Sequence, residues 1–122
     1  MLLKIKNIVP NTRLAVFKGS GNRDYTDEDI MFHDECLFEK ELELKKGDYF
    51  IRTMHKEFFF ENIDVDLNKE DQIITLKNRI DPSSVDNLEN HRFFISEYLE
   101  KSNNDQSDLL GLYESLRTKY RV

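Results

Sequence analysis

Residues 39–76 contain the pattern that most constrains the fold, because apolar and charged side chains alternate there through three successive runs. Glutamates at positions 39, 41 and 43 alternate with Phe38, Lys40, Leu42 and Leu44, and a second run begins at Tyr49, after the break at residues 45–48. A third run alternates apolar with acidic residues from Ile63 to Leu67. A period of two with a short glycine-containing break is typical of antiparallel strands that bury one face. The pattern therefore predicts a sheet over one core, formed by Leu42, Leu44, Tyr49, Ile51, Ile63, Val65, Leu67, Ile74 and Leu76.

Apolar runs outside this region extend the predicted sheet. The N-terminal residues alternate, Pro10-Asn11 is typical of a turn, and a second apolar run covers residues 13–17. Cys36 shares its register with Leu42, so we expect its thiol on the buried face, where thiols are unreactive. The strands expected from these patterns cover about residues 2–6, 13–17, 36–44, 49–55, 58–67 and 72–80.

The chain changes character at Asp81-Pro82. Asp81 can cap a helix with Pro82 at its first position, or Ser83 can cap it with Asp86 three residues further on. Apolar residues then recur at helical spacing in two segments, separated by the polar residues 103–106. We expect a helical hairpin that either covers the open face of the sheet or docks onto a partner.

Together these elements predict an α+β fold that is mainly β. We expect a β-sandwich-like domain of about six antiparallel strands over residues 1–80 and a two-helix extension over residues 81–122, packed on it as a single globular unit. The sharp turn at Asp81-Pro82 favours packing of the first helix on the sheet. The polar link before the second helix favours an external contact for part of that helix.

The composition excludes several classes of protein. The single cysteine, Cys36, excludes an internal disulfide framework, and Lys4 and Lys6 follow Met1 too closely for a secretory leader. No run approaches the ~20 apolar residues of a membrane span, so we expect a cytoplasmic protein without membrane insertion. With 24 acidic and 18 basic side chains the net charge is −6, which disfavours nucleic acid as a partner. Two explanations of the negative charge stay open: it keeps the protein soluble, or it binds a basic surface of another protein.

Residues 19–35 show neither helical nor strand periodicity and begin with Gly19-Ser20-Gly21. We expect a long loop here, mobile in the free protein and rich in acidic residues. Loops longer than about 12–15 residues within a compact domain are usually functional or disordered. The segment is therefore a predicted contact surface.

Motifs for catalysis, metals and cofactors are incomplete. A calcium loop from Asp64 would need glycine where Lys69 stands and glutamate where Thr75 stands. His33 and Cys36 are only two potential metal ligands, and the glycine loop lacks the lysine of a phosphate-binding motif. His33 among loop acids could act as a general acid or base, but no nucleophile can be assigned to it. We therefore expect no enzyme, no metal and no cofactor.

The run Leu42-Glu43-Leu44-Lys45-Lys46-Gly47-Asp48-Tyr49-Phe50-Ile51, followed by the strands that end at Leu76, carries a resemblance. It resembles the glycine-tyrosine hairpin of prealbumin-like β-sandwiches such as PEGA domains and carboxypeptidase regulatory-like domains. The resemblance covers residues 38–76 and implies a non-catalytic sandwich, with Gly47 in the hairpin turn and Tyr49 packed across the sandwich. Such domains serve as adhesion, spacer or protein-binding modules, and the helical tail departs from their pattern.

Three classes of function follow from these features. The leading prediction is a protein–protein interaction or assembly subunit that binds a protein partner or a second copy through a sheet edge, the loop 19–35 and the C-terminal helices. The second is an acidic inhibitor or immunity-type protein that blocks a basic site on an enzyme, and the third is a small enzyme that uses His33. The predicted partner-binding residues are Asp24, Tyr25, Asp27, Asp29, Phe32, His33, Phe59, Leu110, Tyr113 and Tyr120.

Overall fold

A computed structural model describes residues 1–21, 24–56, 60–78 and 88–120 of the chain. It is an α+β fold that is mostly strand, with two helices at the C-terminus, as the sequence predicts. The described residues form five strands rather than the six predicted, and four of these form an antiparallel sheet in the order β2-β1-β3-β4. The fifth, β5, pairs parallel with β1.

Strand β1 (Leu2–Lys18) replaces the two predicted N-terminal strands. The expected turn at Pro10-Asn11 is instead a bend within this strand, where Asn7 and Asn11 have positive φ angles of 63° and 67°. Asparagine tolerates this backbone conformation better than most residues, so the strand changes direction without ending. The register with β2 shifts on both sides of Ile8, which identifies the bend as a pair of bulges.

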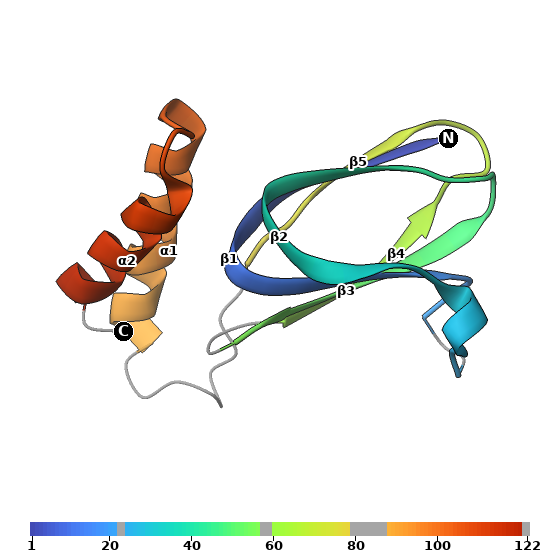
Figure 1. Cartoon of the computed structure of the whole chain (residues 1–122), viewed down its shortest axis with the longest axis horizontal. Helices are drawn as coiled ribbons and strands as arrows, with labels where there is room; N and C mark the ends of the chain where they lie inside the picture. Colours follow the sequence, from blue (N-terminus) through green and yellow to red (C-terminus); the bar gives the residue numbers. More distant parts are fainter. Residues whose placement is uncertain (22–23, 57–59, 79–87, 121–122) are drawn as a thin grey trace.

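The bent β1 organises the other strands around it. Strand β2 (Ile30–Glu43) pairs with β1 along most of its length. On the opposite side of β1, β5 (Gln72–Thr75) pairs with its first half and β3 (Asp48–His55) with its second half, while β4 (Phe60–Asp66) pairs with β3. The strands consequently curve around a common interior (Figure 1).

Apolar side chains from all five strands fill this interior. Leu14 and Ile51 are fully buried at its centre, on neighbouring strands β1 and β3. The nine side chains that the alternation places in the core all belong to it, which confirms the predicted register. Tyr49, Ile51, Val65, Leu67 and Leu76 are buried, and Leu42, Leu44, Ile63 and Ile74 are partly buried against them.

The predicted loop 19–35 is wrong over its second half. Residues 30–35 belong to β2, and a short 3₁₀ turn, η1 (Asp27–Asp29), precedes them. These residues lack a clear period because both faces of this part of the strand are largely exposed. Pairing with residues 13–17 of β1 makes them a strand, and such pairing is not visible in local sequence.

Strand β5 ends at Thr75 instead of continuing to residue 80 as predicted. The Glu61 side chain accepts hydrogen bonds from the backbone N–H groups of Lys77, at 3.3 Å, and of Asn78. Asn78 also has a positive φ of 50°. The chain therefore leaves the ladder where a side chain of β4 satisfies its donors.

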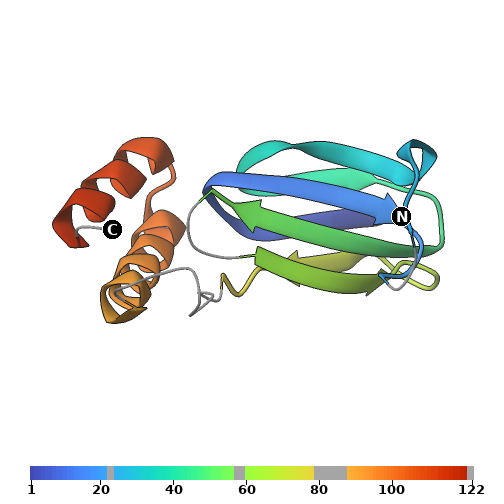
Figure 2. The ribbon, with the colours of Figure 1, turned by 90° about the horizontal axis from the view of Figure 1, so that it is seen from below.

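Helices α1 (Leu88–Asn104) and α2 (Leu109–Tyr120) lie together beyond one end of the strands (Figures 1 and 2). One expected position of the hairpin was over an open sheet face, but the curved strands fill their own interior, and the helices pack against the bend of β1 and the end of β3. Val9 of β1 lies in one buried cluster with Phe94, Ile95, Tyr98, Tyr113 and Leu116. The predicted helix caps at Asp81 and Ser83 lie outside the described residues, as does the boundary between residues 80 and 81, so the domain division stays a prediction.

Candidate protein-interaction surface

Strand β2 is an edge strand throughout its 14 residues. Within the described parts of the chain, β1 is its ladder partner, and the opposite edge of β2 pairs with no other strand. Strands of globular proteins usually have about 5–6 residues, so this edge is long. An unpaired edge presents a row of backbone N–H and C=O groups that can accept a further strand.

Apolar side chains are exposed along this edge. Ile30 and Met31 each retain 37% of their accessible surface, and Leu37 retains 47%. Single exposed apolar residues are normal in folded proteins. Here three of them lie on one unpaired strand, and this concentration favours the burial of the edge by another chain.

A row of carboxylates occupies the second half of the same strand. Glu39, Glu41 and Glu43 are all exposed and stand at alternate positions. Lys4 Nζ lies 3.0 Å from Glu39 Oε2 and 3.5 Å from Glu41 Oε1, and the N-terminal amine lies 3.0 Å from Glu43 Oε1. The hydrogen bond to Glu39 raises the pKa of Lys4 above its usual value. These solvent-exposed pairs are individually weak, so the row stays available to other cations.

The opposite side of β2 is apolar and only partly covered. Phe32, Cys36 and Leu42 pack against the strand core while remaining partly accessible. This placement confirms the predicted core register of Cys36, and burial raises the pKa of its thiol. Lys40 Nζ lies 4.7 Å from the centroid of the Phe32 ring, within cation–π distance. The charged Lys40 side chain therefore contacts the periphery of the core at this edge.

Residues 19–21 and 24–29 fold back onto the sheet, although we expected them to be mobile. The Tyr25 ring stacks on Phe17 with 4.5 Å between centroids, and it also faces Phe50 at 5.8 Å. The N–H of Gly21 donates to Asp64 Oδ1 at 2.9 Å. A Cβ atom on Gly21 would lie 2.6 Å from the Phe50 ring, so only glycine fits this close approach.

The acidic residues predicted to bind a partner in this segment divide by role. Asp24 and Asp27 are exposed. Asp29 accepts a hydrogen bond from the Thr26 N–H at 3.0 Å and so helps to form the turn η1 directly before β2. These carboxylates continue the acidic character of β2 beyond its N-terminal end.

The remaining predicted contact residues lie on two elements. His33 is exposed on β2, next in the chain to Phe32. On α2, Leu110 is 55% exposed, whereas the Tyr120 hydroxyl lies 3.3 Å from Glu97 Oε1. Tyr113 is fully buried and belongs to the core between helices and strands, so we remove it from the candidate surface. Phe59 lies outside the described residues.

The buried partner of Tyr113 is a residue that the sequence analysis overlooked. The Tyr113 hydroxyl lies 2.6 Å from His55 Nε2, where the last residue of β3 meets α2. The pKa of His55 is lowered to about 4, mainly by burial; a hydrogen bond with the Pro10 backbone opposes this shift, and the charge of Arg117 adds to it. The alternation of β3 contains the signal, because His55 shares the register of Tyr49 and Ile51. We assign this pair to helix docking rather than to chemistry.

The described surface also includes three hollows outside β2. One of about 440 Å³ lies between β4 and β5 and includes Ile63 and Ile73. One of about 310 Å³ is lined by Asp48, Asp64 and Asp66 among others. None of the predicted contact residues that the structure describes lines either hollow.

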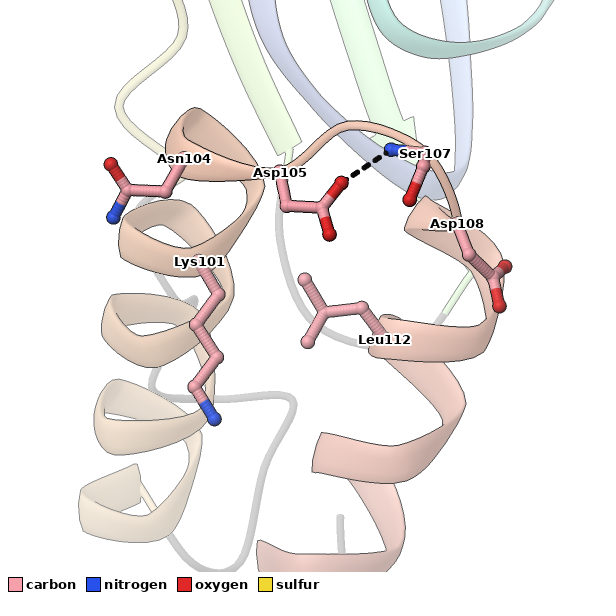
Figure 3. A pocket seen from close by; sticks show the side chains of 6 residues that line it. All are labelled: Lys101, Asn104, Asp105, Ser107, Asp108 and Leu112. Carbon is pink, nitrogen blue, oxygen red and sulfur yellow. Dashed lines mark hydrogen bonds between the residues drawn. The ribbon is translucent and has the colours of Figure 1, made fainter.

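The third hollow, of about 300 Å³, lies where the two helices are joined. Leu112 points from α2 toward α1, and Lys101 extends along α1 (Figure 3). Asp105 accepts a hydrogen bond from the Ser107 N–H at 3.0 Å, which orders the link between the helices. The hollow is a shallow feature of the helix connection, and its polar groups do not converge on a common point.

Two further properties bear on the sequence predictions. Among the described residues, no three histidine, cysteine or acidic side chains are placed to hold a metal ion. No helix in the described ranges is long and apolar enough to cross a membrane.

The edge of β2 is thus the longest unpaired backbone surface in the described chain, and it is flanked by apolar and acidic side chains. The resemblance of residues 38–76 to prealbumin-like modules stays a prediction. Comparison of the chain with protein-family models, with curated proteins and with solved structures finds no match, so the surface itself must carry the functional argument.

Proposed function

We propose that this chain is a non-catalytic protein-interaction or assembly subunit that binds an extended segment of another protein along the edge of β2. The observation that carries the proposal is the 14-residue unpaired edge with three exposed apolar side chains. In strand addition, main-chain hydrogen bonds supply affinity and alternate side chains supply specificity. The partner would extend the sheet beyond β2.

The rest of the fold supports this role by holding the edge rigid. Pairing with β1 from Ile30 to Glu43 supports β2 along nearly its full length. The turn η1 and the stacked Tyr25 ring hold the segment that enters the strand. A preorganised edge loses little conformational entropy when a partner strand binds.

A peptide library displayed on phage provides the test, because it requires no known partner. We expect selected peptides to perturb the NMR amide signals of residues 30–43. We also expect the double variant Met31→Gln/Leu37→Gln to bind them about tenfold more weakly, since truncating central apolar contacts typically costs 1–2 kcal/mol. The control Met54→Gln/Ile73→Gln removes two apolar residues of β3 and β5 that are more exposed than Met31 and Leu37, and it should bind normally.

The outcomes of this selection are decisive. Failure to select any peptide overturns the proposal, as does a set of peptides whose amide perturbations lie away from β2. Equal binding to both double variants would show that the apolar side chains of β2 contribute nothing.

The acidic inhibitor is the second candidate, favoured by the row Glu39, Glu41 and Glu43. In that role the carboxylates would meet a basic enzyme site side chain to side chain, without added main-chain pairing. Hydrogen exchange separates the two roles, because strand addition protects the N–H groups along the β2 edge and a side-chain contact does not.

A further inference from the structure

We infer that the segment received by β2 is a basic strand, with lysine or arginine at alternate positions facing water and apolar residues between them. This inference rests on the proposed function and specifies its partner. The row of glutamates on β2 calls for basic residues on the water-facing side of the partner strand. The partly covered apolar side of β2 calls for apolar residues on the side that faces the core.

The charge of β2 selects a cationic partner. The strand contains five carboxylates, at positions 34, 35, 39, 41 and 43, and a single lysine, Lys40. Neutralisation by the rest of the structure is limited: Lys4 is shared between Glu39 and Glu41, and the N-terminal amine meets Glu43. Oppositely charged residues on facing strands stabilise pairing, and like charges directly opposite destabilise it.

The spacing of these carboxylates matches an added strand. Glu39, Glu41 and Glu43 stand at alternate positions, so their side chains project from one face of the sheet. Residues directly across a strand pair have Cβ atoms about 4.5–5.5 Å apart, within reach of a lysine or arginine. Three basic residues at every second position of the partner would each meet a glutamate.

A second copy of β2 is a poorer partner for the row of glutamates, because it carries only one lysine. In a two-fold antiparallel pair of β2 strands, each residue faces the one equally far from the axis on the other side. If the two-fold axis passes through Glu39, Glu39 faces its own copy and Glu35 faces Glu43 of the second copy. If the axis passes through Leu37, Glu35 faces Glu39 of the second copy. Both of these registers face carboxylate with carboxylate, which disfavours them, whereas an axis at Cys36 avoids such contacts within β2 and opposes Glu39 to His33.

The inward side of β2 specifies the intervening residues. Phe32, Cys36 and Leu42 are partly buried against the core. Apolar side chains at the inward positions of the added strand would cover them, with a gain of roughly 25 cal/mol per Å² of apolar surface removed from water. Lys40 stands over Phe32 in the free protein, and its charge disfavours a partner with basic residues on this inward side.

Three synthetic peptides test the inference. Each has about ten residues, which at ~3.3 Å per residue span most of β2, with valine at every second position. The intervening positions carry lysine, glutamine or glutamate. We expect fluorescence anisotropy to show that the lysine peptide binds most tightly and the glutamate peptide most weakly. At about 0.05 M salt the lysine peptide should bind at least about tenfold more tightly than the glutamine peptide, and much of this difference should be lost at about 0.5 M salt.

A charge-matched pair of variants locates the effect. The triple variant Glu39→Gln/Glu41→Gln/Glu43→Gln should bind the lysine peptide about tenfold more weakly, as expected for the loss of three exposed ion pairs. Its affinity for the glutamine peptide should not change. The control Glu70→Gln/Glu89→Gln/Glu100→Gln removes the same charge from exposed positions outside β2 and should bind both peptides normally.

Each outcome separates the inference from the proposed function. Equal binding of the three peptides along β2 would overturn the basic partner and keep strand addition, whereas binding of the lysine peptide without perturbation of β2 amides would overturn both. Analytical ultracentrifugation tests whether a second copy of this chain occupies the β2 edge. If the free protein is a dimer and Leu37→Gln dissociates it, the partner of β2 is a second copy and the basic strand is wrong.

Discussion

The interior of the strands and the junction with the helices are both buried, but they are built from different chemistry. Among the described residues, eight buried apolar residues of the strands form the interior together with Leu67 and Leu76, and the Tyr49 hydroxyl donates to the Lys45 carbonyl at 2.6 Å. The junction buries apolar residues too, yet it also contains His55 and the hydroxyl of Tyr113 in contact with each other.

Because of this difference, the stability of the two regions should respond to different changes, namely to side-chain volume in the interior and to pH at the junction. Apolar packing responds to lost volume and is indifferent to pH. A buried imidazole must stay neutral, so proton concentration acts on it directly. We therefore expect volume changes to dominate in the strands and protonation to dominate where the helices dock.

The largest effect should come from Ile51→Ala, at the centre of the strand interior. Ile51 is fully buried, and truncation of such a side chain costs about 2–5 kcal/mol through lost transfer energy and a cavity. Urea unfolding at neutral pH measures the loss. The matched change Ile73→Ala, at a side chain that is 65% exposed, should cost far less. Similar losses for the two variants would contradict the assignment of the interior.

The second effect concerns pH and should arise at the junction. Burial holds the pKa of His55 at about 4 in the folded protein, compared with about 6.5 when unfolded, so below pH 6.5 the unfolded chain binds a proton that the folded chain excludes. Its contribution to stability is therefore fully present above pH 6.5 and falls as the pH drops toward 4. Between pH 7 and pH 5 we expect a loss of about 2 kcal/mol in the free energy of unfolding.

Two histidine variants locate this pH dependence. His55→Gln removes the buried titrating group and should flatten the unfolding free energy between pH 7 and 5. His33→Gln removes an exposed histidine of β2 and should keep the wild-type slope. A slope that survives in His55→Gln would assign the pH response to another region.

The smallest effect compares two buried hydroxyls of the junction. Tyr113→Phe leaves His55 Nε2 without its 2.6 Å partner and should cost roughly 1–2 kcal/mol, because an unsatisfied buried acceptor keeps its desolvation penalty. The Tyr98 hydroxyl is also buried, which raises its pKa, but it has no hydrogen-bond partner among the described residues. Tyr98→Phe should therefore be neutral or stabilising.

Hydrogen exchange in α1 and α2 shows where each tyrosine variant acts. Faster exchange in the helices of Tyr113→Phe, with the strands unchanged, would place the loss at the junction. A greater loss for Tyr98→Phe than for Tyr113→Phe would reverse the roles we assign to the two hydroxyls.

The accuracy of the sequence predictions followed the strength of the local pattern. Strand β3 and the core positions from Leu42 to Leu76 were predictable because alternation with a glycine break is a short-range signal. The bend in β1 was not, since Pro10-Asn11 has the composition of a turn. Pairing with β5 before the bend, with β3 after it and with β2 on both sides of it makes the two halves one strand.

The candidate surface was predicted in part. Phe32 and His33 were selected as contact residues within a supposed loop, and they lie on β2. Their membership of an edge strand could not be read from the sequence, because an edge is defined by the absence of a neighbour. Tyr113 was selected for the same surface, but its apolar stripe on α2 packs against α1 and Val9 of β1.

The sequence by itself determined the class of the fold, the inward side of most strands and the presence of two helices, because these depend on residue periodicity along the chain. Only the tertiary structure decided that β2 is an unpaired edge, that the helices dock on Val9 and His55, and that a tyrosine and a histidine 58 residues apart share a buried hydrogen bond. Periodicity reports which side of an element is apolar. It contains no information on which distant element covers that side, because the choice depends on the packing of the whole chain.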